Sequence, residues 1–172
     1  MTTITTSTSF NVEASLNEWL RAALTAFTRP SWLTTMPGIV YDAPQTTASM
    51  PCFSFLHIPV ATLDAYEGRN VGDGMKGAKS MGMMDVSCWV SRSKSVSYAA
   101  QLRTMADMVQ SAAVAKTAVV VMDYATSLTA PSSAGYKVDI GDITVTPTQP
   151  DPNTDVERIR ILIDYSYVFR AN

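Results

Sequence analysis

The segment "ERIRILIDYSYVFRAN" at residues 157–172 decides the fold, because it alternates between apolar and polar residues. An alternation with a period of two indicates a β-strand with one buried face. At roughly 3.3 Å per residue the run would reach about 45 Å, although typical strands are only about 5–6 residues long. The even positions are mostly polar or charged, with Leu162 and Val168 as exceptions. The apolar positions are odd-numbered: Ile159, Ile161, Ile163, Tyr165, Tyr167 and Phe169.

The composition suits one domain with a sizeable core. The chain has 172 residues, of which 47% are hydrophobic and only 16% are charged. Charged residues usually make up about a quarter of a globular chain, so this shortage fits a protein that covers part of its surface with partners. The net charge is −2 and no run of Lys or Arg is present, which argues against a groove that grips nucleic acid through its phosphates. No apolar run approaches the roughly 18 residues of a membrane-spanning helix.

The N-terminal residues and the cysteines add little chemistry. Residues 1–11 are rich in Thr and Ser and lack the basic and apolar regions of a secretory signal, so we expect a flexible arm. Cys52, Cys88 and the single histidine, His57, lie outside any metal-ligand spacing. We therefore expect no metal, no cofactor, and two free, buried thiols in a reducing cytoplasm, although the sequence leaves a disulfide between them open.

Two amphipathic helices are expected. The letters "SLNE" at 15–18 have the form of a capping box with Ser15 as the cap, and apolar residues then recur at helical spacing until Pro30 prevents continuation. Ser97 is positioned to cap the second helix, whose apolar face extends to Ala113. The apolar face of the first helix consists of Leu16, Trp19, Leu20, Ala23, Leu24 and Phe27.

A hairpin with a long loop lies between the two helices. We expect a short strand at 38–42, a central strand at 51–61 and another strand at 83–91. The intervening residues 62–82 contain five glycines without a hydrophobic period, so we expect a flexible loop. Three of these glycines match the form GxGxxG of a dinucleotide-binding site. The strand that should precede this motif and the helix that should follow it are not indicated, so we do not expect a dinucleotide site.

The residues after the second helix are predicted to complete the sheet. Residues 116–124 indicate a buried strand, the Ser-rich stretch after Pro131 a turn, and 136–149 a strand with a candidate bulge at Gly141. A turn rich in Pro and Asp then leads into the terminal strand. The order predicts an α+β fold for a single domain at residues 12–172: a mostly antiparallel sheet with two helices packed on one face and a long hairpin loop.

Catalytic chemistry is hard to find in this sequence. His57 has no nucleophile context around it, and a structural role explains it best. Asp123, Asp139 and Asp142 could serve acid–base or metal chemistry, yet solvated loop or edge positions explain them better. We therefore expect a protein that binds proteins and is not an enzyme. The alternative from another class is a small α+β ligand-binding or enzymatic domain with a pocket near His57 and Asp85.

The order of elements resembles the tail-terminator and tail-completion proteins of long-tailed bacteriophages, the minor tail protein U-like neck proteins. The resemblance is topological and covers about residues 12–172. It rests on an amphipathic first helix, a hairpin with a glycine-rich loop, an Ala/Met-rich second helix and a long last strand. The segments that carry it are "SLNEWLRAALTAF", "SYAAQLRTMADMVQSAAV" and "ERIRILIDYSYVFRAN".

This resemblance implies a structural virion protein that caps the finished tail tube as a ring, expected to be a homohexamer, and joins the tube to the head connector. Its implied partners are further copies of itself, the tail tube protein, and a head-completion or connector protein, with sheath or other neck proteins as further candidates. DNA would pass through the ring without specific binding, and no membrane is involved. The protein would reside in the tail or neck of the virion after assembly in the host cytoplasm. A head-closure stopper or a tail-tube-like subunit is the alternative role.

Two sets of candidate contact residues follow from the resemblance. The glycine-rich loop would project toward a partner, and the last strand would serve as an assembly edge for a neighbouring subunit. A cluster of methionines could supply an adaptable contact surface, while core packing explains Met83 and Met84 equally well. The candidate loop residues are Arg69, Asp73, Met75, Lys76 and Lys79. The candidate subunit-interface residues are Arg158, Arg160, Leu162 and Val168.

Overall fold

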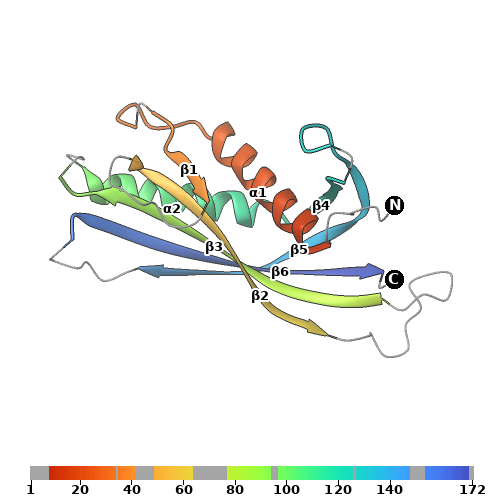
Figure 1. The fold of residues 1–172 in the computed structure, drawn as a ribbon. Helices are drawn as coiled ribbons and strands as arrows, with labels where there is room; N and C mark the ends of the chain where they lie inside the picture. The colour runs from red at the N-terminus through yellow and green to blue at the C-terminus, as the bar shows by residue number, and fades with distance from the viewer. Residues whose placement is uncertain are drawn as a thin grey trace.

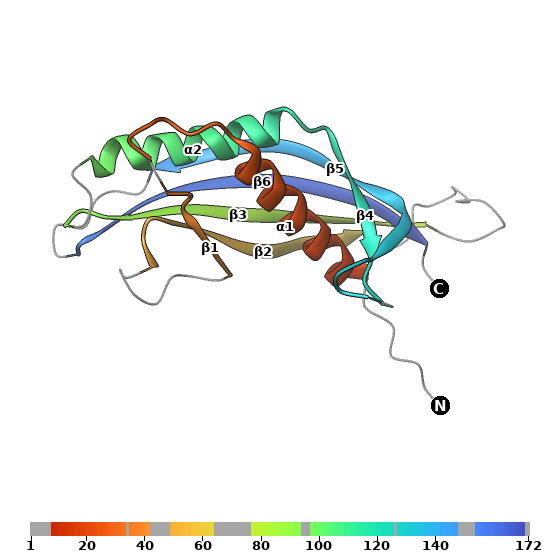
Figure 2. The ribbon, with the colours of Figure 1, turned by 90° about the horizontal axis from the view of Figure 1, so that it is seen from above.

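The protein consists of a curled six-stranded sheet with two helices on one of its faces (Figure 1). The computed structural model describes residues 8–33, 35–41, 49–63, 77–93, 97–125, 127–147 and 154–170. The elements are α1 (Thr8–Ala26), β1 (Gly38–Tyr41), β2 (Cys52–Leu63), β3 (Gly77–Ser91), α2 (Tyr98–Val114), β4 (Ala118–Asp123), β5 (Ser132–Pro147) and β6 (Val156–Arg170). Seen from above, α2 lies along the strands and α1 crosses them (Figure 2). The predicted α+β fold, with both helices on one face of a mostly antiparallel sheet, is confirmed.

The last strand lies inside the sheet. The strand order is β1-β2-β3-β6-β5-β4, in which β1 runs parallel to β2 and the other neighbouring strands are antiparallel. β3 and β6 pair along their whole length, from Gly77 opposite Arg170 to Ser91 opposite Val156. The prediction of an unusually long last strand is confirmed. The expectation that it is an assembly edge is wrong, because β3 and β5 occupy both of its edges.

The first helix begins earlier than its capping-box pattern predicts. α1 starts at Thr8, so Ser15 lies inside the helix and residues 8–11 do not belong to a flexible arm. The Ser15 hydroxyl donates a hydrogen bond to the Asn11 carbonyl at 2.6 Å and accepts one from the Met122 backbone N–H at 2.9 Å. A serine that bonds back to the preceding turn in this way is compatible with a helix interior. Ser15 therefore connects α1 to β4 and does not cap the helix.

The long loop between β2 and β3 is shorter than predicted. β2 extends to Leu63 and β3 already begins at Gly77, so both ends of the predicted loop belong to the sheet. Gly82 lies within β3 opposite Tyr165, and a side-chain carbon added at Gly82 would overlap the Tyr165 ring. This glycine is therefore needed for close packing within a strand, although in the sequence it resembles the loop glycines before it.

The strand β5 also begins earlier than predicted. It starts at Ser132, where the sequence suggested a turn after Pro131, and Gly135 adopts a positive φ of 83° within it. The pairing of β5 with β6 shifts between Ile140 and Ile143, which confirms the predicted bulge at Gly141.

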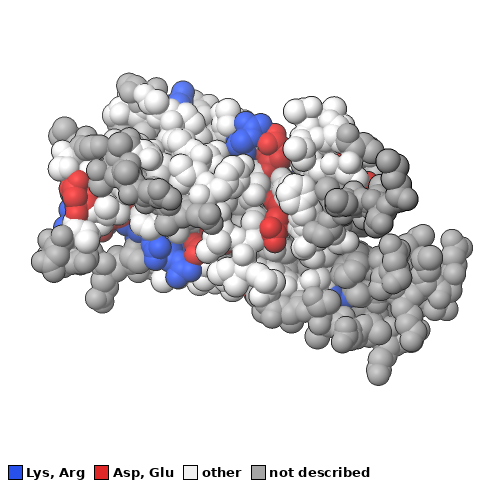
Figure 3. Space-filling view, in the orientation of Figure 1, with Lys and Arg blue, Asp and Glu red and all other residues white. Residues whose placement is uncertain are grey.

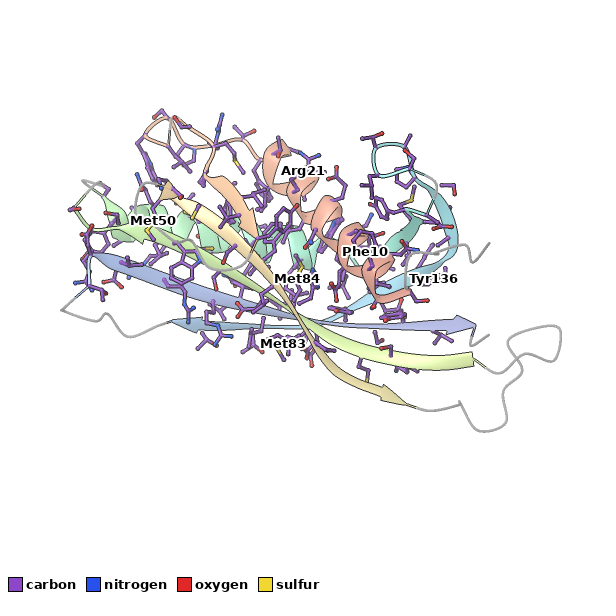
Figure 4. The ribbon with its side chains drawn as sticks, viewed as in Figure 1. Phe10, Arg21, Met50, Met83, Met84 and Tyr136 are labelled. Atoms are coloured by element: carbon purple, nitrogen blue, oxygen red, sulfur yellow. The ribbon has the colours of Figure 1, made fainter. Side chains whose placement is uncertain are left out.

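The core lies between the helices and the upper face of the sheet. Alternate residues of β3 and β6, such as Val86 and Ile161, are fully buried there against the apolar faces of α1 and α2. The prediction that the odd-numbered face of the last strand supports the helices is thus confirmed. Met84 is buried among the core residues, whereas Met83 projects from the opposite side of the sheet (Figure 4). Core packing is therefore correct for Met84 but not for Met83.

Candidate functional site

The helices leave one face of the sheet uncovered, and we call this face the outer face. Its middle is formed by alternate residues of the three strands β2, β3 and β6, on the side to which Met83 points, and β5 continues the face with residues such as Thr144 (Figure 4). Its members on β2 and β3 are Ser54, Leu56, Ile58, Met81, Met83, Asp85, Ser87 and Trp89, and those on β6 are Arg158, Arg160, Leu162, Asp164, Ser166 and Val168.

Part of the outer face is occupied by its own polar contacts, which reach into the middle of the sheet because Asp85 lies between Leu56 and Leu162. Asp85 is only 6% exposed and accepts a hydrogen bond from the Arg160 Nε at 3.0 Å, within an ion pair that raises the pKa of Arg160. Such a charge pair is costly to break once it has lost water, because either partner alone would be left uncompensated. Nearby, the Arg158 guanidinium lies 4.8 Å above the centre of the Trp89 ring. The two arginines predicted at a subunit interface thus already have partners within this face.

The rest of the outer face carries a strip of apolar side chains. We define the apolar strip as Leu56, Ile58, Met81, Met83 and Leu162. The exposed fractions of Leu56, Ile58 and Met81 are 45%, 37% and 39%, while Met83 and Leu162 are half-buried. These residues come from three adjacent strands, and Ile58 lies directly opposite Met83. A contiguous exposed apolar patch marks a surface that binds another protein or membrane more often than it marks ordinary surface.

The predicted contact residues are only partly brought together. Val168, also predicted at the interface, is 39% exposed. It lies opposite Lys79, near the start of β3 and far from the pair formed by Trp89 and Arg158. Lys79 was predicted as a loop residue, but it belongs to β3. The other candidate loop residues lie outside the described residues: Arg69, Asp73, Met75 and Lys76.

His57 and Asp85 do not share a pocket. Asp85 belongs to the outer face, whereas His57 pairs with Met84 and faces the helices. The His57 Nε2 lies 2.8 Å from Asn17 Oδ1, and the imidazole packs edge-on against Tyr165. Burial lowers the pKa of His57 to about 4, so that the ring is neutral at pH 7. This arrangement supports the structural interpretation of His57 and removes the pocket on which the enzymatic alternative was based.

Asp123 and the two thiols occupy ordinary structural positions, whereas Asp139 and Asp142 are exposed on β5 and line an open hollow beside Met81 and Met83. Asp123 accepts hydrogen bonds from the Ala125 backbone N–H at 2.9 Å and from the Asn11 side chain at 3.3 Å. Within the described ranges, no group of three His, Cys, Asp or Glu residues is placed to hold a metal. Cys52 and Cys88 are free and buried, as predicted, and burial raises the pKa of both thiols, that of Cys52 to about 11.

An open groove of about 730 Å³ beside α1 was not predicted. It lies between this helix and the segment that connects β4 to β5, and burial raises the pKa of Glu13 in its wall. No sequence motif marks the groove, because its residues come from separate segments that only the tertiary fold brings together. Its lining includes Phe10, Glu13, Asn17, Tyr41, Tyr124 and Leu128.

Comparisons with known proteins do not identify a family. No protein-family model and no curated protein matches the chain. One solved structure aligns with 91% of this chain and 98% of its own, with 16% sequence identity and a TM-score of 0.43. A likeness at this level says nothing about function. Neither of the described helices is long and apolar enough to cross a membrane.

Proposed function

We propose that this protein is a structural virion component that caps a bacteriophage tail tube as a ring and joins the tube to the head connector. The observation that carries the proposal is the apolar strip on the outer face. A two-layer domain with one uncovered sheet face gains stability when a second protein covers the apolar part of that face. The order of helices and strands also agrees with the resemblance to tail-terminator proteins.

The division of the outer face indicates where the contact would lie. The Asp85–Arg160 pair satisfies its own charges, so bringing a partner against it would yield little net energy. Covering Leu56, Ile58 and Met81 would contribute roughly 1 kcal/mol per side chain, since each is already more than half buried. The apolar strip is therefore the proposed contact surface, and the arginines would set its border.

The low charge of the molecule favours a role in assembly. In the view of Figure 3, most of the described surface is formed by uncharged residues, with only isolated basic and acidic groups. A ring through which DNA must pass should not hold the phosphates by a basic stripe. A subunit with few charged residues and a net charge of −2 fits that requirement.

A phage that carries a stop codon in this gene tests the proposal. We expect separate filled heads and tails, and we expect purified wild-type protein to restore joining in the extract. The double variant Leu56→Asp/Ile58→Asp should fail to restore joining, because two carboxylates would interrupt the apolar strip. The double variant Ala99→Asp/Ala100→Asp places the same two carboxylates at exposed sites on α2, away from the outer face, and should restore joining fully.

Other particle phenotypes would replace the proposal by a related role or reject it. Heads that lose their DNA while tails are complete would indicate a head-closure stopper. Absence of tails would indicate a tail-tube-like subunit. Normal infectious particles without the protein would reject a role in the virion.

A further inference from the structure

The two lateral edges of the sheet are stepped. On one side, β1 pairs only with Cys52–Phe55 of β2, and no other described strand lies beside Leu56–Leu63. We call this open segment the β2 recess. On the other side, β4 pairs with β5 no further than Asp139, and no other described strand lies beside Ile143–Pro147. We call that segment the β5 recess.

The two steps can be compared by their height, meaning their position along the strands. β1 pairs with Cys52–Phe55 of β2, which pair with Val86–Trp89 of β3, so β1 lies at the height of Val86–Trp89. The β5 recess lies level with Met84–Cys88 of β3, so the projecting strand on one side matches the recess on the other. At the opposite end, β4 begins level with Met81, within the range that the β2 recess spans. A second copy placed beside the first, at the same height, would place β1 in the β5 recess and the first residues of β4, Ala118–Val120, beside the Ala61–Leu63 end of the β2 recess.

The strand directions also permit this arrangement. The four strands β2, β3, β6 and β5 alternate in direction, and both β1 and β4 run in the same direction as β2. The second sheet is added at the same level with its helices on the same side. β1 of one copy would then run antiparallel to the β5 recess of its neighbour. β4 of that neighbour would run parallel to the β2 recess of the first copy.

Among the described residues, β1 and most of the β5 recess lack the features that normally prevent strand addition, whereas Pro59 and Pro147 lie in the two recesses and Asp123 ends β4. Natural edge strands are protected by charged residues, prolines or covering elements. β1 and residues 143–146 of the β5 recess contain neither charged residues nor proline. The edge strands instead expose the apolar side chains of Tyr41, Val120 and Val145, with exposed fractions of 62%, 46% and 39%. Pro59 lies in the β2 recess, where it removes one N–H, so the contact between β4 and the β2 recess is the weaker half of the joint.

We propose that neighbouring copies join by these stepped edges, with β1 inserted into the β5 recess of the next copy and β4 of that copy inserted into the β2 recess of the first. This inference rests on the ring of the proposed function and names the surface that would hold its subunits together. Because the two surfaces differ, the contact is heterologous, and its repetition closes into a ring when the rotation between copies divides a full turn.

The joint places one particular pair of side chains opposite each other. Tyr41 pairs with Phe55, which pairs with Val86. Val145 pairs with Ile161, which also pairs with Val86, so Tyr41 and Val145 lie at the same height in the sheet. Residues paired directly across strands share a face, and their Cβ atoms lie about 4.5–5.5 Å apart. Tyr41 of one copy would therefore lie beside Val145 of the next.

Disulfide trapping between two variants tests this pairing. Tyr41→Cys and Val145→Cys are prepared separately, mixed, assembled on tails that lack the protein, and oxidised. In an equal mixture we expect up to about half of the protein to form a covalent dimer, because each copy meets the matching variant at the relevant joint about half of the time. Neither variant should cross-link alone, because Tyr41 lies opposite Val145 and not opposite itself. The native Cys52 and Cys88 are buried and should stay reduced. Thr144→Cys mixed with Tyr41→Cys is the matched control, since Thr144 points to the outer face, and its yield should be several-fold lower.

Each result decides a different question. Cross-linking of either variant with itself would overturn the heterologous joint and indicate a two-fold contact. Rings visible on tails by electron microscopy without a cross-link in the mixture would overturn the stepped-edge joint while leaving the proposed function in place. Failure of the wild-type protein to associate with itself or with tails would overturn both.

Discussion

Gly82 is the position where one added methyl group should harm the fold most clearly. A side-chain carbon at this residue would overlap the ring of Tyr165, which is buried between His57 and the neighbouring strand. We expect Gly82→Ala to lower the free energy of unfolding by about 2 kcal/mol, because overfilled cores typically lose about 1–3 kcal/mol. Urea denaturation followed by circular dichroism measures the change.

Gly141 provides the control for this prediction. A carbon added there would lie 3.4 Å from Asp164, which requires only a small adjustment. Gly141→Ala should therefore change the stability by less than about 0.5 kcal/mol. An equal loss at both sites would mean that backbone freedom, and not the Tyr165 contact, requires the glycine.

His57 should make the stability depend on pH between about pH 7 and 5, above the range in which carboxylates ordinarily titrate. Burial lowers its pKa to about 4 from an ordinary 6.5, so the unfolded chain binds the proton first as the pH falls. The stabilising contribution is complete above about pH 6.5 and is lost as the pH falls toward 4. We expect about 2 kcal/mol less stability at pH 5 than at pH 7.

The variant His57→Gln isolates this effect, since it retains a polar partner for Asn17 without a titrating ring. The chain contains a single histidine, so the slope between pH 7 and pH 5 should nearly vanish in the variant. Urea titrations at both pH values compare the two proteins. An unchanged slope would show that His57 is accessible to protons in the folded state.

At the scale of elements, Ser15 links the first helix to an edge strand. Its hydroxyl bonds both to the preceding turn of α1 and to the Met122 backbone N–H of β4. Ser15→Ala would leave that N–H without its partner, and we expect a loss of about 1–3 kcal/mol in the free energy of unfolding. Thr25 makes the same bond to the preceding turn, to the Arg21 carbonyl, but on an exposed part of the helix. Thr25→Ala should cost less than about 0.5 kcal/mol, and equal losses would show that the link to β4 contributes nothing.

For the whole molecule, the hydrophobic periodicity of the sequence predicted the helices and strands better than it predicted which strands pair with each other. The alternation in the last strand correctly predicted its length and its buried face, because side chains on a strand must alternate between two faces. The same alternation contains no information about which strands lie beside it, so its central position and its pairing with β3 were not predictable. The start of α1 was misjudged for a related reason: Ser15 fits a cap pattern locally, and only its contact with β4 shows its actual role.

The candidate site was predictable only in part. Even-numbered residues of the last strand could be assigned to the face away from the helices, which places Leu162 and Val168 correctly on the outer face. The partner of Arg160 on the same face could not be predicted, because its ion pair with Asp85 joins residues that are distant in the sequence. The stepped edges depend on the register of every strand, and the sequence does not determine register.

The central position of β6 also has a consequence for synthesis of the chain. β6 follows β3 and β5 in the sequence, yet it is the strand that joins them. While a ribosome is still producing β6, the two halves of the sheet have no common strand, and α2 lacks one of the strands against which it packs. Closure of the core therefore waits for β6 to emerge, and such non-local pairing makes folding slow and leaves the nascent chain open to aggregation and chaperone binding.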